Sequence, residues 1–369
     1  MQENENVAKK KIGIISGLFG TKYVGGAEIQ LYYLSRQFAK MGHEVHVITS
    51  NESIIDKDEM CDIGIALHLL NCKALHTSKF KIDFYWNVWK KLIELKPDVC
   101  LIRTAPLAPI VLLYTEIYKK KFIYSVTHDK DCLIRRVKWS REFIKVLVRR
   151  LCQFAIKSAD IVVAQSVYQK ELLKKNFGVD SFVIRNGHYI PELTSPKADP
   201  PIVLWLANLR KEKRIDLFVE LAQRLEGMKC LFVVAGKPMD DGCLEVLEEG
   251  IKKQENLYYY GALSVKQALE LVNKSSLLVN TSDNEGFPNA FIEAWMRKTP
   301  TVGLNVDPDN LIKDYKMGFH SFNFENLVRD VKYLLENKSL LDELGRNAYK
   351  YAIEQHDLSK ISKMYADLF

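Results

Sequence analysis

Short apolar runs alternate with amphipathic stretches of helical length along the whole chain. The spacing of Ala27, Leu31, Leu34, Phe38 and Met41 places them on one stripe and predicts the first helix. The apolar runs of the first half predict strands over residues 11–16, 44–49, 63–70, 98–102, 122–126 and 160–165. Those of the second half predict strands over residues 202–206, 229–235, 257–260, 276–280 and 300–304. Because helices separate the strands, the fold class is predicted to be α/β with parallel sheets.

A proline-rich segment interrupts this alternation. Residues 186–201 contain four prolines and show no sustained hydrophobic period, as expected of a boundary between domains. Both halves are predicted to be doubly wound, Rossmann-like domains. The predicted organisation is a first domain over 1–187, a linker over 188–201, a second domain over 202–355, and a C-terminal helix over 356–369 that crosses back to the first domain.

Composition agrees with two folded domains. The chain has 369 residues, of which 47% are hydrophobic and 27% charged, and this excludes a disordered or fibrous protein. Residues 104–115, the longest stretch without a charge, are well short of the ~20 apolar residues of a membrane-spanning helix. The polar N-terminus does not resemble a signal peptide. We therefore expect a cytoplasmic protein, whose seven cysteines are reduced thiols rather than disulfides or zinc ligands.

Basic charge is concentrated in residues 133–157. This segment has eight Lys or Arg residues against one Glu, an excess that equals the +7 net charge of the protein. One face of the predicted helix is basic and carries Lys138, Arg141, Lys145 and Arg149. We interpret this face as a contact with an anionic membrane surface or with acidic substrate groups; the alternative is a solvated helix face.

Two loops at strand ends have residues suited to phosphate. Gly25 and Gly26 lie between the first strand and the first helix, where a glycine pair lets backbone N–H groups approach a phosphate. Arg210 and Lys213 follow the first strand of the second half and can hold a diphosphate. The alternatives are a flexible turn for the glycines and a solvated basic turn for the two cations.

The most specific pattern joins two glutamates. Glu285 precedes a predicted helix and Glu293 lies inside it, so the two carboxylates can bind hydroxyls on two parts of one ligand. Pro288 suits the first helical turn, and free N–H groups at the helix start would face the ligand. The segment between the glutamates that completes this predicted binding loop is Gly286, Phe287, Pro288 and Asn289. The alternatives are compensation of the helix dipole by Glu285 and an exposed helix position for Glu293.

His128 ends the strand predicted over 122–126. At this position a histidine can orient or polarise a substrate group, and the alternative is a structural histidine. Two Asp-x-Asp patterns, at Asp129–Asp131 and Asp307–Asp309, have no His or Cys partner at ligand spacing. We therefore predict no metal site.

The chain resembles the family 4 retaining glycosyltransferases of the GT-B fold over nearly its whole length. The segments that carry the resemblance are Gly25–Glu28 with Gly42–Val45, Ala159–Val162 with Gln165–Ser166, Asn186–Gly187, Asn208–Lys213, and Glu285–Pro288 with Glu293, which is that family's E-x7-E motif. Three segments depart from the family pattern. They are Arg214 where a glycine is usual, Asn280–Asp283 where serines are usual, and Asn305–Asn310 where a glycine pair is usual.

The resemblance implies a role for each candidate residue. Arg210 and Lys213 would hold the donor diphosphate, Glu293 the donor ribose and Glu285 the transferred sugar. Gly25 and Gly26 would line a central cleft from the other, acceptor-side domain, and His128 would lie near the reacting sugar.

We therefore expect a retaining, metal-independent glycosyltransferase without a cofactor. It would move a sugar from a UDP- or GDP-linked donor to a hydroxyl of a glycan acceptor. A lipid-linked acceptor of bacterial surface polysaccharide synthesis would fit a peripheral position on the inner face of the plasma membrane. The alternatives are a nucleotide-sugar isomerase or a phosphorylase of the same fold, and a basic nucleic-acid-binding protein. No nucleic-acid recognition motif is found in the chain, so we expect no nucleic-acid partner.

Overall fold

The computed structural model describes residues 8–20, 26–50, 63–71, 82–133, 143–193 and 196–369, with the backbone alone at 82 and 143–146. Contacts divide the chain into two units. Unit 1 is Met1–Gly187 together with Leu358–Phe369, and unit 2 is His188–Asp357.

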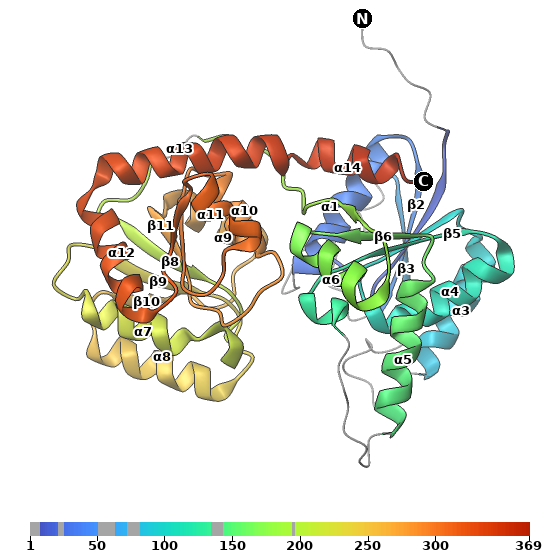
Figure 1. Ribbon diagram of the computed structural model, residues 1–369, viewed down its shortest axis with the longest axis horizontal. Coiled ribbons are helices and arrows are strands. Elements are labelled where there is room, and N and C mark those ends of the chain that lie inside the picture. Colours follow the sequence, from blue (N-terminus) through green and yellow to red (C-terminus); the bar gives the residue numbers. More distant parts are fainter. Residues whose placement is uncertain (1–7, 21–25, 51–62, 72–81, 134–142, 194–195) are drawn as a thin grey trace, which may run out of the picture. The chain divides into compact units, whose positions relative to one another are not determined.

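Within the described residues, unit 1 is built on a seven-stranded parallel sheet of order β3-β2-β1-β4-β5-β6-β7 (Figure 1). The strands are β1 Lys11–Ile15, β2 Glu44–Ser50, β3 Ile65–Leu70, β4 Val99–Ile102, β5 Lys121–Ser125, β6 Ile161–Ala164 and β7 Phe182–Val183. The strand order changes direction between β1 and β4. In an open parallel sheet, this switch point is where strand ends and helix starts border a ligand crevice.

Helices cover both faces of this sheet. Helices α1 (Gly26–Lys40) and α14 (Leu358–Ala366) pack on one face. The other face is covered by α3 (Ile82–Leu95), α4 (Ala108–Tyr118), α5 (Phe143–Lys157) and α6 (Val167–Phe177). Alternate residues of β4 enter the two cores: Cys100 and Ile102 on one side, Val99 and Leu101 on the other. A strand buried on both faces must be apolar throughout, which explains the continuous apolar runs.

Within its described residues, unit 2 repeats this plan with a six-stranded parallel sheet of order β10-β9-β8-β11-β12-β13. The strands are β8 Ile202–Leu206, β9 Leu231–Ala235, β10 Leu257–Tyr259, β11 Leu277–Asn280, β12 Thr301–Gly303 and β13 Gly318–His320. One face packs against α7 (Ile215–Arg224), α8 (Asp241–Lys253) and α12 (Phe324–Glu336). The other packs against α9 (Val265–Lys274), α10 (Asn289–Trp295), α11 (Leu311–Asp314) and α13 (Lys338–Gln355). The switch point of this sheet lies between β8 and β11.

The α/β class and the two doubly wound sheets predicted from sequence are confirmed, and short β7 and β13 are additions. The segment 188–201, predicted to be a linker, instead belongs to unit 2. The backbone N–H of His188 donates to His356 O at 2.8 Å, and that of Ala198 donates to Lys274 O at 2.9 Å. Prolines prevented a regular element here, but they did not prevent the segment from packing.

The C-terminal helix belongs to unit 1. Helix α14 packs against α1, and the Tyr365 and Ser125 hydroxyls are 2.9 Å apart in a hydrogen bond. A Cβ atom at Gly187 would lie 2.9 Å from Leu358 Cδ1, so the glycine permits the close approach of α14. The observed helix starts at Leu358, two residues after the predicted boundary.

Gly236 is required where the loops after β8 and β9 meet. Its φ is +154°, and a Cβ atom there would lie 1.7 Å from the carbonyl oxygen of Ala207. We predict that Gly236→Ala lowers the free energy of unfolding by about 2 kcal/mol or more and the melting temperature by at least about 4 °C. Gly227→Ala is the matched control, because no atom lies within 4 Å of its added Cβ. Equal melting temperatures of the two variants would contradict this account.

Candidate active site

Polar side chains from two distant segments meet at the switch point of unit 2. A short 3-10 helix, η3 (Lys211–Lys213), follows β8, and a loop over 281–288 follows β11. Lys213 Nζ forms an ion pair with Glu285 Oε1 across 72 positions of sequence. The two side chains are 19% and 13% exposed, so the pair is shielded yet open to a ligand. The sequence singled out both residues, and the structure adds that they contact each other.

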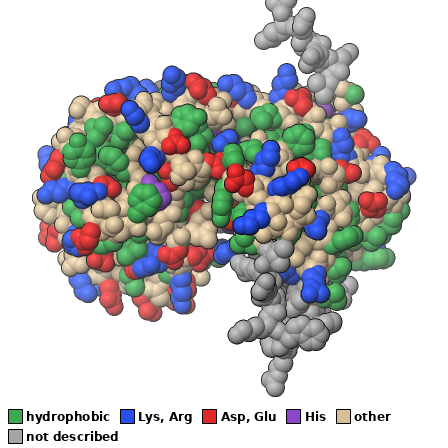
Figure 2. All heavy atoms as spheres, viewed as in Figure 1, with side chains coloured by type: hydrophobic (Ala, Val, Ile, Leu, Met, Phe, Trp, Pro, Cys, Tyr) green, Lys and Arg blue, Asp and Glu red, His purple; other side chains and the backbone are tan. Residues whose placement is uncertain are grey.

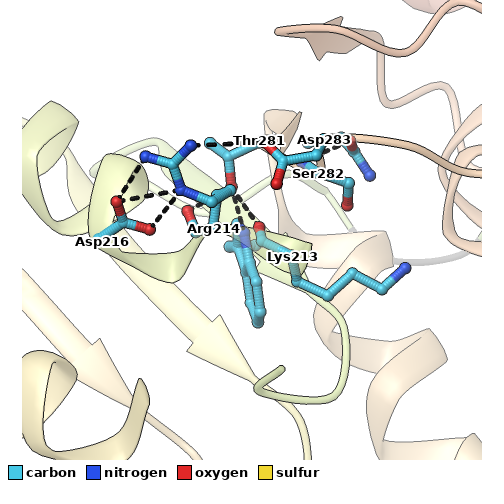
Figure 3. A network of polar contacts seen from close by, with 8 residues as sticks. Lys213, Arg214, Asp216, Thr281, Ser282 and Asp283 are labelled. Carbon is cyan, nitrogen blue, oxygen red and sulfur yellow. Dashed lines mark hydrogen bonds and ion pairs between the residues drawn. The ribbon is translucent and has the colours of Figure 1, made fainter. Parts of the chain in front are cut away.

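The backbone of the two loops is tied together beside Lys213 (Figure 3). Thr281 Oγ1 lies 2.8 Å from Lys213 O and 2.9 Å from Arg214 O, and it accepts a hydrogen bond from Trp205 Nε1 at 2.9 Å. The backbone N–H of Asp283 donates to Glu212 O at 2.9 Å. These bonds fix Lys213 and Glu285 on opposite sides of one junction.

Arg214 belongs to the scaffold of the junction. Its φ of +52° is left-handed, which explains why a glycine suits this position in the family that the chain resembles. Its guanidinium pairs with Asp216 at 2.8 Å and with Asp283 at 3.4 Å, and the hydrogen bond to Asp216 raises the pKa of Arg214. Figure 3 shows the Lys213 side chain extending away from this cluster. The Arg214 charge is therefore compensated locally, while Lys213 is directed at Glu285.

Glu285 keeps capacity to bind a ligand. Its Oε1 accepts from Lys213 and, at 2.9 Å, from Ser282 Oγ. Within the described part of the chain, no hydrogen bond reaches Oε2 of Glu285. A half-satisfied carboxylate of this kind can accept a hydrogen bond from a hydroxyl group.

Glu293 is buried in α10. Its residue exposure of 9% excludes the alternative of an exposed helix position. Burial raises the pKa of Glu293 to about 7, and the nearby Arg297 charge opposes the shift. No hydrogen bond to its carboxylate is formed within the described ranges. A buried carboxyl without a local partner is suited to receive hydroxyl groups of a ligand.

The loop between the glutamates differs in two respects from expectation. Pro288 caps α10 with extended ψ of 121° and lies before the first turn, which begins at Asn289. The side chain of Asn289, predicted to bind donor, hydrogen-bonds to His188, whose pKa is lowered to about 3 by burial. Phe287 is buried against the rings of Trp295 and His356, which anchors Gly286 and Pro288 beside Glu285.

Arg210 lies at the carboxyl end of β8 and caps η3. Its side chain is exposed and forms no ion pair or hydrogen bond with any described residue. This cation therefore remains available next to the Lys213–Glu285 pair.

In unit 1, His128 is exposed between β5 and the turn of η2 (Asp129–Cys132). Asp131 Oδ2 accepts from Thr127 Oγ1 at 3.2 Å, and Asp129 Oδ1 accepts from Gln169 Nε2 at 3.0 Å. Gly26 is the first residue of α1, whereas Gly25 lies outside the described residues. The Asp129–Asp131 pattern thus has local structural roles.

Asp307 of the second Asp-x-Asp pattern also bonds locally, since it accepts from the backbone N–H groups of Ile312 and Lys313. Across the described ranges, no group of three or more His, Cys, Asp or Glu side chains is placed to hold a metal ion.

Sequence reasoning missed a buried polar cluster in unit 1. Arg103 directly follows β4 and is 2% exposed, and it bonds to Asn186, which in turn bonds to Gln165. The signal available in the sequence was a charged residue that ends a buried apolar strand.

Two doubly wound sheets in one chain, with polar side chains at the switch point of the second, define a two-domain α/β protein of the GT-B architecture. A crystal structure of Anabaena Alr3699/HepE in complex with UDP-glucose matches with a TM-score of 0.76 and 16% identity, over 97% of this chain and 99% of that one. The crystal structure of WaaG, a glycosyltransferase involved in lipopolysaccharide biosynthesis, matches with a TM-score of 0.74 and 17% identity, over 97% and 99% of the two chains.

Sequence comparison identifies the family. The model "Glycosyltransferase Family 4" matches residues 24–190, and the model "Glycosyl transferases group 1" matches residues 191–351. An uncharacterized glycosyltransferase of Haemophilus influenzae is 22% identical over 95% of this chain and 98% of its own length. The poly(ribitol-phosphate) alpha-N-acetylglucosaminyltransferase of Staphylococcus aureus is 24% identical over 58% of this chain, and the match spans 44% of that enzyme. The chain belongs to the GT-B glycosyltransferases of the family 4, group 1 type.

Burial of Glu293 predicts a pH-dependent stability. The pKa of Glu293 is about 7 in the folded protein and is ordinarily 4.5. Protonated Glu293 therefore makes its full contribution to the free energy of unfolding below about pH 4.5, and this contribution is lost as the pH rises to about 7. Glu293→Gln cannot ionise, so it should be more stable than the wild type by about 3 kcal/mol at pH 8 and by less than about 1 kcal/mol at pH 5. Denaturant unfolding at both values measures this.

The exposed Glu245 of α8 provides the control. Glu245→Gln should not change the pH dependence of unfolding. A Glu293→Gln difference that is equal at pH 5 and pH 8 would show that Glu293 does not titrate in this range.

Proposed function

We propose that this glycosyltransferase moves a sugar from a UDP- or GDP-linked donor to a hydroxyl of a glycan acceptor, with retention of the anomeric configuration and without a metal ion. The observation that carries the proposal is the Lys213–Glu285 ion pair at the carboxyl ends of β8 and β11. At this edge of the sheet, the Lys213 cation can bind the diphosphate of a nucleotide diphosphate sugar, and the free carboxylate oxygen of Glu285 can bind its sugar.

In the free protein, Lys213 and Glu285 compensate each other. A diphosphate carries more charge than one carboxylate and is therefore a stronger partner for Lys213. The exposed Arg210 would add its planar guanidinium to the same diphosphate. Binding of the donor would then release Glu285 to accept hydrogen bonds from sugar hydroxyls.

Reaction increases negative charge on the leaving diphosphate. Arg210 and Lys213, held at a preorganised junction, would stabilise this charge in the role that a divalent ion plays in metal-dependent transferases. Retention is proposed because the Glu285 to Glu293 spacing is the motif of the retaining enzymes that the chain resembles. Glu293 would bind the donor ribose, and Gly286, Phe287 and Pro288 would border the sugar.

The neighbours support a nucleotide-sugar donor and a glycan acceptor. Alr3699/HepE was crystallised with UDP-glucose, and the Staphylococcus aureus relative is named for a poly(ribitol-phosphate) substrate. In unit 1, we keep His128 as a catalytic candidate and Gly25 and Gly26 as donor-binding candidates, as the family resemblance implies. Transfer to a separate acceptor would distinguish this proposal from an isomerase or a phosphorylase of the same fold.

We also propose peripheral attachment to an anionic membrane, where a lipid-linked acceptor would be anchored, on the cytoplasmic side. Helix α5 exposes large apolar side chains: Leu151 is 49% and Phe154 63% exposed. Only Cys152, Ala155 and Ile156 of the following turn are buried. An exposed apolar stripe beside basic residues is typical of a helix that lies in a membrane interface.

The structure describes only part of the basic face predicted at Lys138, Arg141, Lys145 and Arg149. Arg149 is exposed on α5, whereas Lys138 and Arg141 lie outside the described residues and the side chain of Lys145 is not described. On the face drawn in Figure 2, Lys and Arg side chains are interspersed with Asp and Glu. No helix of the described residues is long and apolar enough to cross a bilayer.

The donor site is tested with single substitutions. We predict that Lys213→Ala and Arg210→Ala each weaken binding of the nucleoside diphosphate about tenfold to a hundredfold, because each removes a charge-assisted hydrogen bond. Glu285→Gln should retain or increase this affinity while it slows sugar transfer, since it removes the competing counter-ion of Lys213. Calorimetric titration in EDTA, with the donor chosen by thermal stabilisation from UDP-, GDP-, ADP- and dTDP-sugars, measures these effects.

The matched control is Lys211→Ala, two residues from Lys213 and 81% exposed. It should bind the nucleotide like the wild type. The assignment fails if Lys213→Ala and Lys211→Ala bind the nucleotide equally, and metal independence fails if EDTA abolishes transfer.

Membrane binding is tested by co-sedimentation with vesicles rich in anionic lipid. Replacing Lys138, Arg141, Lys145 and Arg149 by Gln should weaken binding at 0.1 M salt to the level that the wild type keeps at 1 M salt, because each basic residue contributes about 1 kcal/mol. The wild type should retain part of its binding at 1 M salt through the apolar stripe, and Leu151→Gln with Phe154→Gln should remove that part.

Helix α4 supplies the control pair Leu113 and Ile117, which are 50% and 57% exposed. Replacing both by Gln should leave vesicle binding unchanged. If wild-type protein does not sediment with vesicles at low salt, α5 is a solvated helix and the membrane proposal is wrong.

A further inference from the structure

A guanidinium group without a counter-ion is buried at the switch point of unit 1. Arg103 directly follows β4 at the carboxyl edge of the sheet and is 2% exposed. Burial lowers its pKa, which means that the surroundings do not fully replace the water lost by the charge. A buried cation is normally paired with an anion, so an anionic ligand would stabilise the charged form of Arg103.

The contacts of Arg103 are few and neutral. Its Nη2 donates to Asn186 Oδ1 at 2.9 Å, and its Nε is buried without a hydrogen-bond partner. Among the described residues, no carboxylate comes within the 4.0 Å of an ion pair. The groups whose charge favours the protonated Arg103 from farther away are Tyr365, Glu28 and Tyr124.

Neighbouring bonds hold the Asn186 amide in place. Its Nδ2 donates to Gln165 Oε1 at 2.9 Å, and Gln165 Nε2 donates in turn to the carbonyl of Val126. This chain of neutral groups presents the amide oxygen to Arg103 and supplies no negative charge. The fold therefore fixes the guanidinium without neutralising it.

The surroundings of Arg103 favour an anion. Helix α1 begins at Gly26 after the adjacent strand β1, so its positive end faces the same edge of the sheet. Glu28 in the first turn offsets part of this field, but it forms no ion pair with Arg103. A planar guanidinium with a free Nε matches the paired oxygens of a phosphate.

We propose that unit 1 binds a phosphate group at Arg103, through residues other than those of the Lys213 site of unit 2. The inference rests on the proposed function for its ligand, since the phosphate would belong either to the acceptor or to the diphosphate of the donor. In both cases Arg103 is a substrate-binding residue at the carboxyl edge of the first sheet.

The test uses the full chain with Arg210→Ala and Lys213→Ala as background, so that unit 2 contributes little to phosphate binding. Inorganic phosphate is titrated by calorimetry. Arg103→Gln should weaken its binding at least about tenfold. Arg346→Gln, which removes an exposed arginine of α13, should leave it unchanged.

Asn186→Asp separates a binding role from a bracing role. It keeps an oxygen for Arg103 Nη2 but adds a permanent counter-ion, so phosphate binding should fall at least about tenfold in protein that remains folded, although the hydrogen bond to Gln165 Oε1 is lost. Should Arg103→Gln fail to fold, this variant decides. Phosphate affinity that is unchanged in Asn186→Asp, or the lack of saturable phosphate binding to the background protein, would overturn the proposal.

Titration of UDP into otherwise wild-type protein identifies the source of the phosphate. UDP affinity that falls in Arg103→Gln assigns the site to the donor diphosphate, and unchanged UDP affinity assigns it to the acceptor. Failure of the proposed function has a different signature, because UDP binding would then be indifferent to Arg210→Ala and Lys213→Ala.

Discussion

Parallel strand pairing is the constraint on which the rest of this structure depends. All strands of a parallel sheet end at the same edge, so the loops that follow them are neighbours whatever their distance in sequence. In unit 2, this brings η3 and the loop after β11 together, and with them Lys213 and Glu285. In unit 1, it places Arg103 between the ends of β1 and β5. Both candidate binding sites follow from this geometry.

The loops are held by bonds that do not involve the candidate ligand groups. Thr281 contacts the carbonyls of Lys213 and Arg214, and Asp216 with Asp283 compensates Arg214. Phe287 packs into the core beside Trp295. The rigid part of the junction is therefore separate from the part that would exchange partners when a donor binds. This separation lets Lys213 and Glu285 be preorganised without being permanently committed to each other.

Two buried charged residues have incomplete local compensation, one in each unit. Glu293 is raised to a pKa of about 7 by burial, and the pKa of Arg103 is lowered for the same physical reason. Burial disfavours the charged form of each group because it removes the group from water. A ligand that forms hydrogen bonds or an ion pair with the charged group would stabilise that form. Hydroxyl groups suit the carboxylate and a phosphate suits the guanidinium. Charged residues are usually expected at the protein surface, so the burial of Arg103 and Glu293 distinguishes them as candidate ligand-binding groups.

The sequence by itself determined the α/β class and most strands, because a strand buried on both faces must be apolar throughout. It also singled out Arg210 and Lys213, because they follow a strand end, and Glu285 and Glu293, because they have the spacing of the E-x7-E motif. Only the tertiary structure decided that Lys213 pairs with Glu285, that 188–201 packs on unit 2, and that α5 exposes Leu151 and Phe154. Periodicity reports that one face of an element is apolar. What covers that face, and which distant loop meets which, depends on the packing of the whole chain.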